Sequence, residues 1–225
     1  MPTQTHDIPE LAAEFTAAHP ELSPTQQRLM LASFRLLGEG KPVGPDILAE
    51  RVDLPIEEVT SSIVELPMVH RDERGRIVAL GGLSLAPTSH VLEVDGRRLY
   101  AWCALDTLFL PELLGHPARV HSTCPETGEK ISLTVDSAGV HDVEPPGAVM
   151  SLHGIRGFDL DDVIRTFCCY VHFFASEQAA VAWTAGRQGA YVVSVAEGFE
   201  YGRLYNRGRF PAAFEAGKDD DDPNT

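Results

Sequence analysis

Hydrophobic residues in the first eighty positions recur at the three- and four-residue spacing of amphipathic helices. The pattern predicts four helices, over residues 8–15, 25–37, 47–52 and 55–66. Two short apolar runs, 69–71 and 77–80, then predict a hairpin, because Asp72-Glu73-Arg74-Gly75 between them is a turn sequence. Three helices followed by a hairpin within about 60 residues are the outline of a winged helix-turn-helix module.

Beyond Gly81-Gly82 and Pro87 the pattern changes to the alternation of half-buried strands. Strands are expected at residues 90–94, 99–102, 119–122, 130–135, 149–152, within 163–174, and at 190–193, and helices at 103–114, 177–185 and 195–207. Because many strands arrive in succession before the last helices, an antiparallel α+β fold is favoured over a parallel α/β sheet. The predicted division is an N-terminal extension (1–21), a winged-helix-like module (22–82), a larger α+β domain (83–212) and a disordered acidic tail (213–225).

The charge of the chain changes the interpretation of the winged outline. A formal net charge of −15 over 225 residues argues against nucleic acid and anionic membranes as partners. The helix that would enter a DNA groove carries Glu57, Glu58 and Glu65 and no basic residue. Arg71, Arg74 and Arg76 in the predicted wing are the only features that favour DNA binding.

The cysteines and the N-terminus bear on the compartment. No apolar run approaches the roughly 20 residues that span a bilayer, and residues 1–10 lack the basic and apolar regions of a secretory signal. Four irregularly spaced cysteines without an export signal indicate free thiols in the cytoplasm rather than a disulfide framework.

Two cysteine segments are candidates for chemistry. Cys103 and Asp106 are three residues apart and share one face of a predicted helix start, where the helix dipole should lower the pKa of the thiol. The alternative is that Cys103 is a buried residue acting as a small hydrophobe. Cys168 and Cys169 lie in the expected strand, so their side chains should point to opposite faces, with Cys168 on the more polar one.

Other cysteine chemistries fit the sequence less well. Cys124 begins a turn that looks like a zinc knuckle, but no second pair of ligands accompanies it, so a structural thiol is the better interpretation. His172 follows Cys168 by four residues, which in a strand is about 13 Å and too far for a catalytic dyad. Nucleotide-binding loops, the serine nucleophile elbow and the zinc-protease motif are missing from the sequence.

The cysteine segments resemble those of the organomercurial lyase (alkylmercury lyase) family. The resemblance rests on Arg-Leu-Tyr-Ala-Trp-Cys-Ala-Leu-Asp-Thr at residues 98–107 and Phe-Cys-Cys-Tyr-Val-His-Phe-Phe-Ala-Ser at residues 167–176, and extends from about Leu22 to Phe210. It implies protonolysis of a carbon–mercury bond to a hydrocarbon and Hg²⁺, with Cys103 and Cys168 as thiolates that bind mercury and Asp106 as the carboxyl that relays the proton. Tyr100, Trp102 and Phe167 are implied more weakly as an apolar wall for the organic group.

The resemblance also carries expectations about cofactors and partners. It implies no cofactor, since mercury is substrate and product, and it implies organomercury compounds, cellular thiols and a mercuric reductase as partners. Two alternatives stay open from the residues alone. The chain could be a winged-helix, thiol-based metal-responsive regulator, or a mercury-binding protein without turnover.

Overall fold

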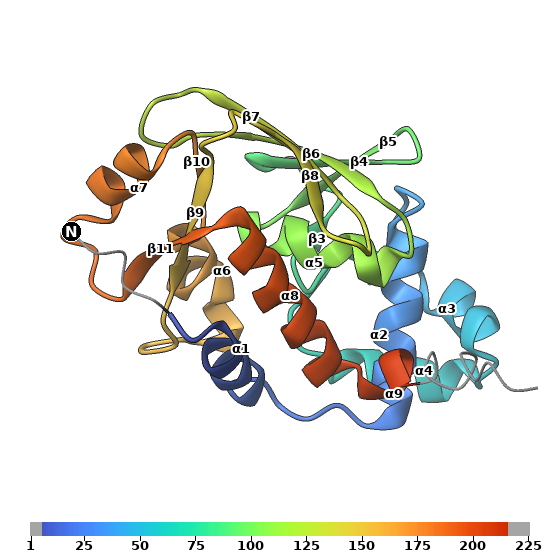
Figure 1. Ribbon diagram of the computed structural model, residues 1–225. Helices are drawn as coiled ribbons and strands as arrows, with labels where there is room; N and C mark the ends of the chain where they lie inside the picture. Colours follow the sequence, from blue (N-terminus) through green and yellow to red (C-terminus); the bar gives the residue numbers. More distant parts are fainter. Residues whose placement is uncertain (1–5, 216–225) are drawn as a thin grey trace, which may run out of the picture.

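The computed structural model describes residues 6–215 (Figure 1). Its first part follows the order that the hydrophobic pattern predicts. The elements are α1 (Ile8–Ala17), α2 (Pro24–Leu37), α3 (Pro45–Val52), α4 (Ile56–Val64), β1 (Val69–Arg71) and β2 (Ile77–Leu80). Ser23 and Gln26 form a capping box that fixes the start of α2, and Pro24 fits there because the first helical position needs no N–H partner.

An antiparallel sheet of eight strands confirms the predicted α+β class. Its strand order is β1-β2-β3-β5-β4-β6-β7-β8, and every pairing is antiparallel. The further strands are β3 (Leu83–Ser84), β4 (His90–Val94), β5 (Arg97–Ala101), β6 (Ala118–Thr123), β7 (Lys130–Val135) and β8 (Val140–Glu144). The sequence did not predict β3, which has two residues, or β8, which lacks buried alternation because it is an edge strand.

The predicted winged module is not set apart from this sheet. Its hairpin continues from β2 through β3 to β5, and Val43 before α3 forms a bridge with Ile77 in β2. The boundary expected after residue 82 therefore falls between two paired strands of one sheet. At the other end, α9 (Pro211–Glu215) includes the first residues of the predicted tail, and residues 216–225 lie outside the described part of the chain.

A smaller sheet lies beside the first, with the order β10-β9-β11. It consists of β9 (Val149–His153), β10 (Phe173–Phe174) and β11 (Ala190–Ser194), with α7 (Glu177–Thr184) connecting β10 to β11. Ser176 caps α7 as predicted, because its hydroxyl accepts a hydrogen bond from the Ala179 N–H.

The prediction of a strand within residues 163–174 is correct only for the last two residues of that segment. The segment forms α6 (Val163–Thr166) and a 3₁₀ turn, η2 (Cys168–Tyr170), preceded by a second 3₁₀ turn, η1 (Leu160–Asp162), and only Phe173–Phe174 is strand. Its backbone hydrogen bonds are local, from Phe167 to Val163 and from Tyr170 to Phe167. A short apolar run does not distinguish a buried strand from buried helical turns, and the expected alternation of faces does not exist here.

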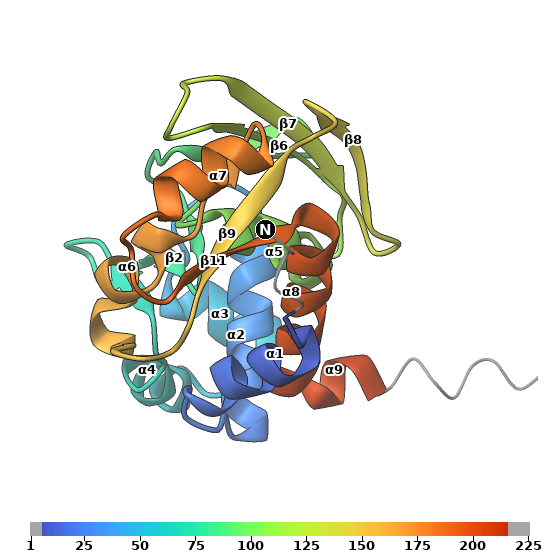
Figure 2. The same ribbon diagram turned by 60° about the vertical axis from the view of Figure 1, so that its left-hand side comes forward.

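Helix α5 (Ala104–Leu114) forms the centre of the molecule. Figures 1 and 2 show it between the larger sheet and α8 (Val195–Arg209). Every residue of α5 except Glu112 is buried, as expected for a helix covered on all sides. The Asn206 amide of α8 donates to the Phe109 carbonyl at 3.0 Å and to Glu112 at 2.8 Å, and so fixes the two helices together.

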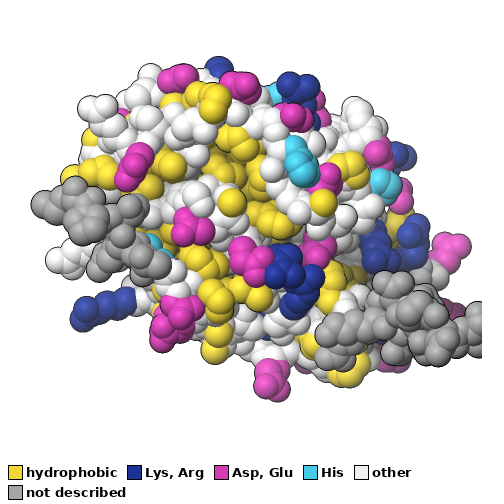
Figure 3. Space-filling view, viewed as in Figure 1, with side chains coloured by type: hydrophobic (Ala, Val, Ile, Leu, Met, Phe, Trp, Pro, Cys, Tyr) yellow, Lys and Arg dark blue, Asp and Glu magenta, His cyan; other side chains and the backbone are white. Residues whose placement is uncertain are grey.

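Acidic side chains on one face of the described molecule are dispersed rather than clustered (Figure 3). On the face drawn in Figure 3, acidic side chains are scattered among apolar and basic ones. Within residues 6–215, no helix is both long and apolar enough to cross a bilayer.

We expect no specific DNA binding by the N-terminal helices. Glu57, Glu58 and Glu65 on and beside α4 are exposed, which repels phosphates. Two of the three wing arginines are already engaged, Arg71 with the Ile63 carbonyl and Arg76 with Asp72. A gel-shift titration with duplexes of random and of palindromic sequence should show no complex at nanomolar protein concentrations. Tight binding that weakens steeply with salt would contradict this prediction.

Candidate active site

Cys103 lies where β5 ends and α5 begins. Its backbone is extended and it is the N-cap residue of α5, so its N–H has no partner within the helix. The Asp106 carboxylate accepts that N–H at 2.8 Å and completes a capping box with Cys103. The hydrogen bond holds the carboxylate beside the thiol, and both side chains are buried, at 1% exposed for Cys103 and 7% for Asp106.

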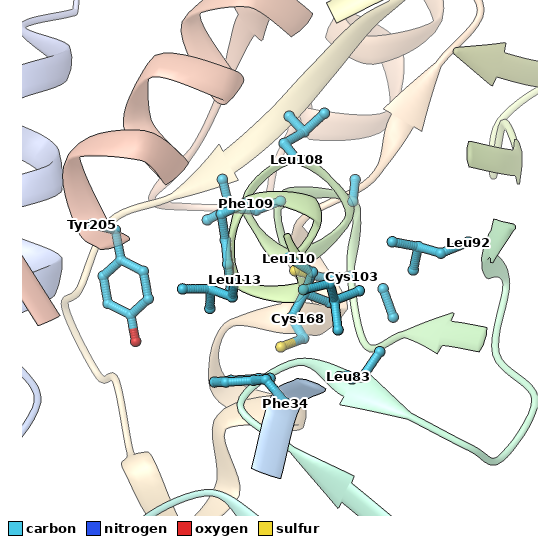
Figure 4. Packing of buried hydrophobic residues seen from close by; sticks show 14 of the residues in the cluster. Phe34, Leu83, Leu92, Cys103, Leu108, Phe109, Leu110, Leu113, Cys168 and Tyr205 are labelled. Carbon is cyan, nitrogen blue, oxygen red and sulfur yellow. The ribbon is translucent and has the colours of Figure 1, made fainter. Parts of the chain in front are cut away.

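Cys168 reaches the same place from the 3₁₀ turn η2. The Ala104 N–H at the start of α5 donates to the Val171 carbonyl at 3.1 Å, which connects the two cysteine segments. Both sulfur atoms and an Asp106 carboxylate oxygen lie within 4.8 Å of one another. Figure 4 shows Cys103 and Cys168 next to each other at the end of α5. Cys169 is exposed, and its thiol donates to the Arg165 carbonyl at 3.0 Å.

Burial decides the protonation of these groups. It raises the pKa of Asp106 to about 7. The pKa of Cys103 is raised well above its usual value, first by burial and then by Cys168 and Asp106. A hydrogen bond from Cys103 lowers the pKa of Cys168, but burial and the nearby Asp106 charge together raise it more. The expectation of a lowered pKa for Cys103 is therefore wrong, because burial favours the neutral thiol.

A small cavity of about 20 Å³ lies against this cluster, with room for about one water molecule. Trp102 and Phe167 line it, as do Asp106 and Cys168. Tyr100 does not, because it lies within β5, paired with Ser84 and Val91. Trp102 and Phe167 of the expected apolar wall therefore lie beside the cluster, and Tyr100 does not.

Sequence analysis missed most of the other wall residues. Phe15 of α1 stacks on Phe167 with ring centroids 4.5 Å apart, and Tyr205 of α8 lies 5.1 Å from Phe15. His19, Met68 and Gly82 complete this side of the cavity. These residues come from segments distant in sequence, so no local pattern indicates that they meet.

Gly82 lies directly over the Asp106 carboxyl group. Its φ of +98° suits glycine, and a Cβ there would lie 2.5 Å from Asp106 Cγ. We expect Gly82→Ala to displace the carboxyl and reduce turnover on the order of 10²-fold, the effect of misplacing a reacting group by about 1 Å. Gly96→Ala is the matched control, since Gly96 has φ +73° and open space around it. Equal steady-state rates for the two variants would contradict this packing role.

The remaining candidates stay apart from the cluster. Among residues 6–215, Cys103, Asp106 and Cys168 form the one group with metal-ligand spacing, and Cys124 is buried at its turn without such partners. The His172 ring is 2.9 Å from the Cys169 carbonyl through Nε2, and stacks edge-on against Trp183.

Comparisons with known proteins show which family this chain resembles. Residues 83–206 match the family model described as alkylmercury lyase. The chain is 43% identical over 170 residues to an alkylmercury lyase of Bacillus cereus, covering 76% of this chain and 77% of the relative. It is 42% identical over 186 residues to an alkylmercury lyase of Pseudomonas putida, covering 83% and 85%.

A solved structure shares the fold. The crystal structure of the mercury-bound form of MerB2 superposes with a TM-score of 0.70 over 90% of this chain and 98% of that one, at 23% identity. The family model spans more than half of the chain, and the curated relatives match over three quarters of it. The chain therefore belongs to the alkylmercury lyase family and is a carbon–mercury lyase.

Proposed function

We propose that this enzyme cleaves R–Hg–SR′ by protonolysis, with Cys103 and Cys168 as the sulfur ligands of mercury and Asp106 as the proton relay. The observation that supports the proposal is the buried cluster in which two thiols and one carboxyl converge within 4.8 Å. Mercury is a soft metal that prefers sulfur. Two thiols and one carboxyl therefore supply both the ligands and the acid that the reaction needs.

The proton and electron balance can be written from these residues alone. One cysteine replaces R′S⁻ on mercury, and its proton leaves on R′SH. The second cysteine then adds to mercury, and its proton passes to the Asp106 carboxylate. The added sulfur raises the electron density on carbon, the protonated carboxyl donates to that carbon, and the carbon–mercury electron pair forms the new C–H bond. The products are RH and Hg²⁺ on two sulfurs.

The pKa of Asp106 suits this relay. At about 7, the carboxyl both accepts and donates a proton near neutral pH. Both thiols start protonated, and mercury binding itself releases their protons. The electrons come from the bond that breaks, so we propose that no cofactor takes part.

The organic group is proposed to contact Trp102 and Phe167. The cavity of about 20 Å³ is too small for any organomercurial, so its walls must move apart for the substrate. Small thiols or a mercuric reductase are proposed to remove the bound Hg²⁺, in the cytoplasm, because a bis-thiolate of mercury exchanges by attack of another thiol.

One experiment tests this mechanism against the two alternatives. The protein is incubated with phenylmercury and excess thiol, and benzene and bound mercury are measured. Catalytic benzene supports the lyase mechanism, provided that Cys103→Ser eliminates it. Mercury retained on the protein without benzene would indicate a binding protein, and a mercury-dependent gel shift would indicate a regulator.

A further inference from the structure

Arg209 near the end of α8 is a buried cation without a counter-ion. Its side chain is 5% exposed, and Nη1 donates to the Pro20 carbonyl at 2.6 Å. Nη2 has no hydrogen-bond partner, and no carboxylate of residues 6–215 lies within ion-pair distance. Burying an unpaired guanidinium is unfavourable. The position is therefore suited to an anion that is supplied from outside.

Arg209 lines a cleft of about 760 Å³ between α1, the segment before α2 and α8. A cleft of this size accommodates a small molecule. Among the lining residues that the structure describes, Glu21 alone is acidic, and its side chain is exposed at the surface. The cleft lining therefore holds one buried cation, Arg209, and one exposed carboxylate, Glu21.

Two other residues of the cleft have unpartnered buried acceptors. The His19 ring is 2.7 Å from the Phe15 carbonyl through Nδ1, which must be the donor, so Nε2 of the neutral ring is an acceptor. Gln27 donates through Nε2 to the Leu22 carbonyl at 3.1 Å, which leaves Oε1 as an acceptor. Neither His19 Nε2 nor Gln27 Oε1 has a partner. The cleft lining thus offers one cationic donor, Arg209, which could pair with a carboxylate of a ligand. It also offers two neutral acceptors, His19 Nε2 and Gln27 Oε1, which could each accept an N–H of the same ligand.

The cleft adjoins the reacting groups through shared walls. His19 lines both the cleft and the cavity that contains Asp106 and Cys168. Tyr205, which lines the same cavity, lies one helical turn before Arg209, and its ring is 5.4 Å from that of His19. His19 is therefore a wall shared by the cleft and the cavity, so a ligand in the cleft lies on the other side of that side chain from Cys168.

We propose that this cleft binds the amino and carboxylate groups of an amino-acid thiol that carries the organomercurial into the site. The inference rests on the proposed function, because it names R′ in R–Hg–SR′. Arg209 pairs with the carboxylate, and His19 Nε2 and Gln27 Oε1 accept the amino N–H groups. The three polar atoms are buried beneath neighbouring atoms, so binding includes rotation of the Arg209 and Gln27 side chains.

Steady-state kinetics with different carrier thiols test the proposal. Phenylmercury is supplied as its adduct with cysteine, 3-mercaptopropionate or 2-mercaptoethanol. For Arg209→Gln we expect KM to rise about tenfold with the two carboxylate carriers, the loss of one charge-assisted interaction. KM with mercaptoethanol and kcat with all three should stay unchanged. Arg207→Gln, an exposed neighbour on α8, is the control and should match wild type.

The mercaptoethanol adduct also shows whether Arg209→Gln is folded. If that variant turns over none of the adducts, Arg209→Lys, which keeps the charge, replaces it and should raise KM selectively for the carboxylate carriers. An equal change of KM for all three carriers, or no change for any, would overturn the proposal.

A binding measurement separates this proposal from the proposed mechanism. S-methylcysteine has the amino and carboxylate groups but no free thiol. Calorimetry should show it binding to wild type and Arg207→Gln, and about tenfold more weakly to Arg209→Gln. Such binding without benzene release from any adduct would refute the mechanism and keep the subsite. Benzene release with no such binding to any variant would refute the subsite and keep the mechanism.

Discussion

Cys168→Ser is expected to eliminate hydrocarbon release, whereas Cys169→Ser should keep most of the wild-type rate. Cys168 is buried with its sulfur beside Cys103, while Cys169 is exposed and only donates to a backbone carbonyl. A serine hydroxyl is a hard, weak ligand for mercury, so the second sulfur would be lost in the first variant alone. The activity of both variants is measured as the benzene that they release from phenylmercury, detected by gas chromatography.

The pair of variants is its own control, because the two substitutions are chemically identical and adjacent in sequence. Cys169→Ser should change the thermal midpoint little, since an exposed side chain loses little packing. Equilibrium dialysis should show one tightly held mercury on wild type and Cys169→Ser, and weaker retention on Cys168→Ser. A reversed order of activities would mean that Cys169 is the reacting thiol.

Asp106→Ala is expected to spare mercury capture and slow carbon–mercury cleavage on the order of 10²-fold or more, the usual effect of losing a general acid. Two thiols still hold the metal, but the proton must then come from a poorly placed donor. Single-turnover kinetics with preloaded phenylmercury measure the cleavage step directly. An unchanged rate would refute the relay.

Asp106→Asn distinguishes the proposed role of Asp106 as an acid from its role in capping the start of α5. The asparagine oxygen can still accept the Cys103 N–H, so the start of α5 is preserved while the ionisable group is lost. The wild-type kcat/KM should rise through about pH 7, because the carboxylate form accepts the thiol proton, and this inflection should be missing in the variant. Equal pH profiles would place the relevant ionisation on another group.

Helices and strands could be predicted from the sequence more completely than the cluster of Cys103, Asp106 and Cys168. Helices α2 and α8, and most strands of the larger sheet, follow from periodicity and caps. The spacing of Cys103 and Asp106 correctly predicts that they share the start of a helix, but it leaves open a purely structural cysteine. Two arguments single out Cys168: the resemblance of two long segments, and a strand alternation that the structure does not contain at this position.

The wrong and missed predictions share one cause: each concerns a feature that the local hydrophobic pattern does not determine. In residues 163–174 the apolar run is shorter than the length at which helix and strand periodicities differ, and local hydrogen bonds decide the turns. The pKa of Cys103 depends on what covers the helix start, which the segment itself does not contain. Phe15 and Tyr205 meet over the cavity only because α1 packs along α8, a long-range contact that no local pattern indicates.

The apolar side chains around the small cavity also bear on which metals reach the cysteines. Two thiols and a carboxyl are a ligand set that would suit Zn²⁺. A zinc ion, however, arrives as a hydrated dication and would have to shed its water before entering a space of about 20 Å³ walled by Phe15, Trp102 and Phe167. A neutral organomercury thiolate carries no such hydration shell. We therefore expect the apolar walls to favour a neutral mercury thiolate over a hydrated dication, in addition to the preference of the two sulfur atoms for soft metals.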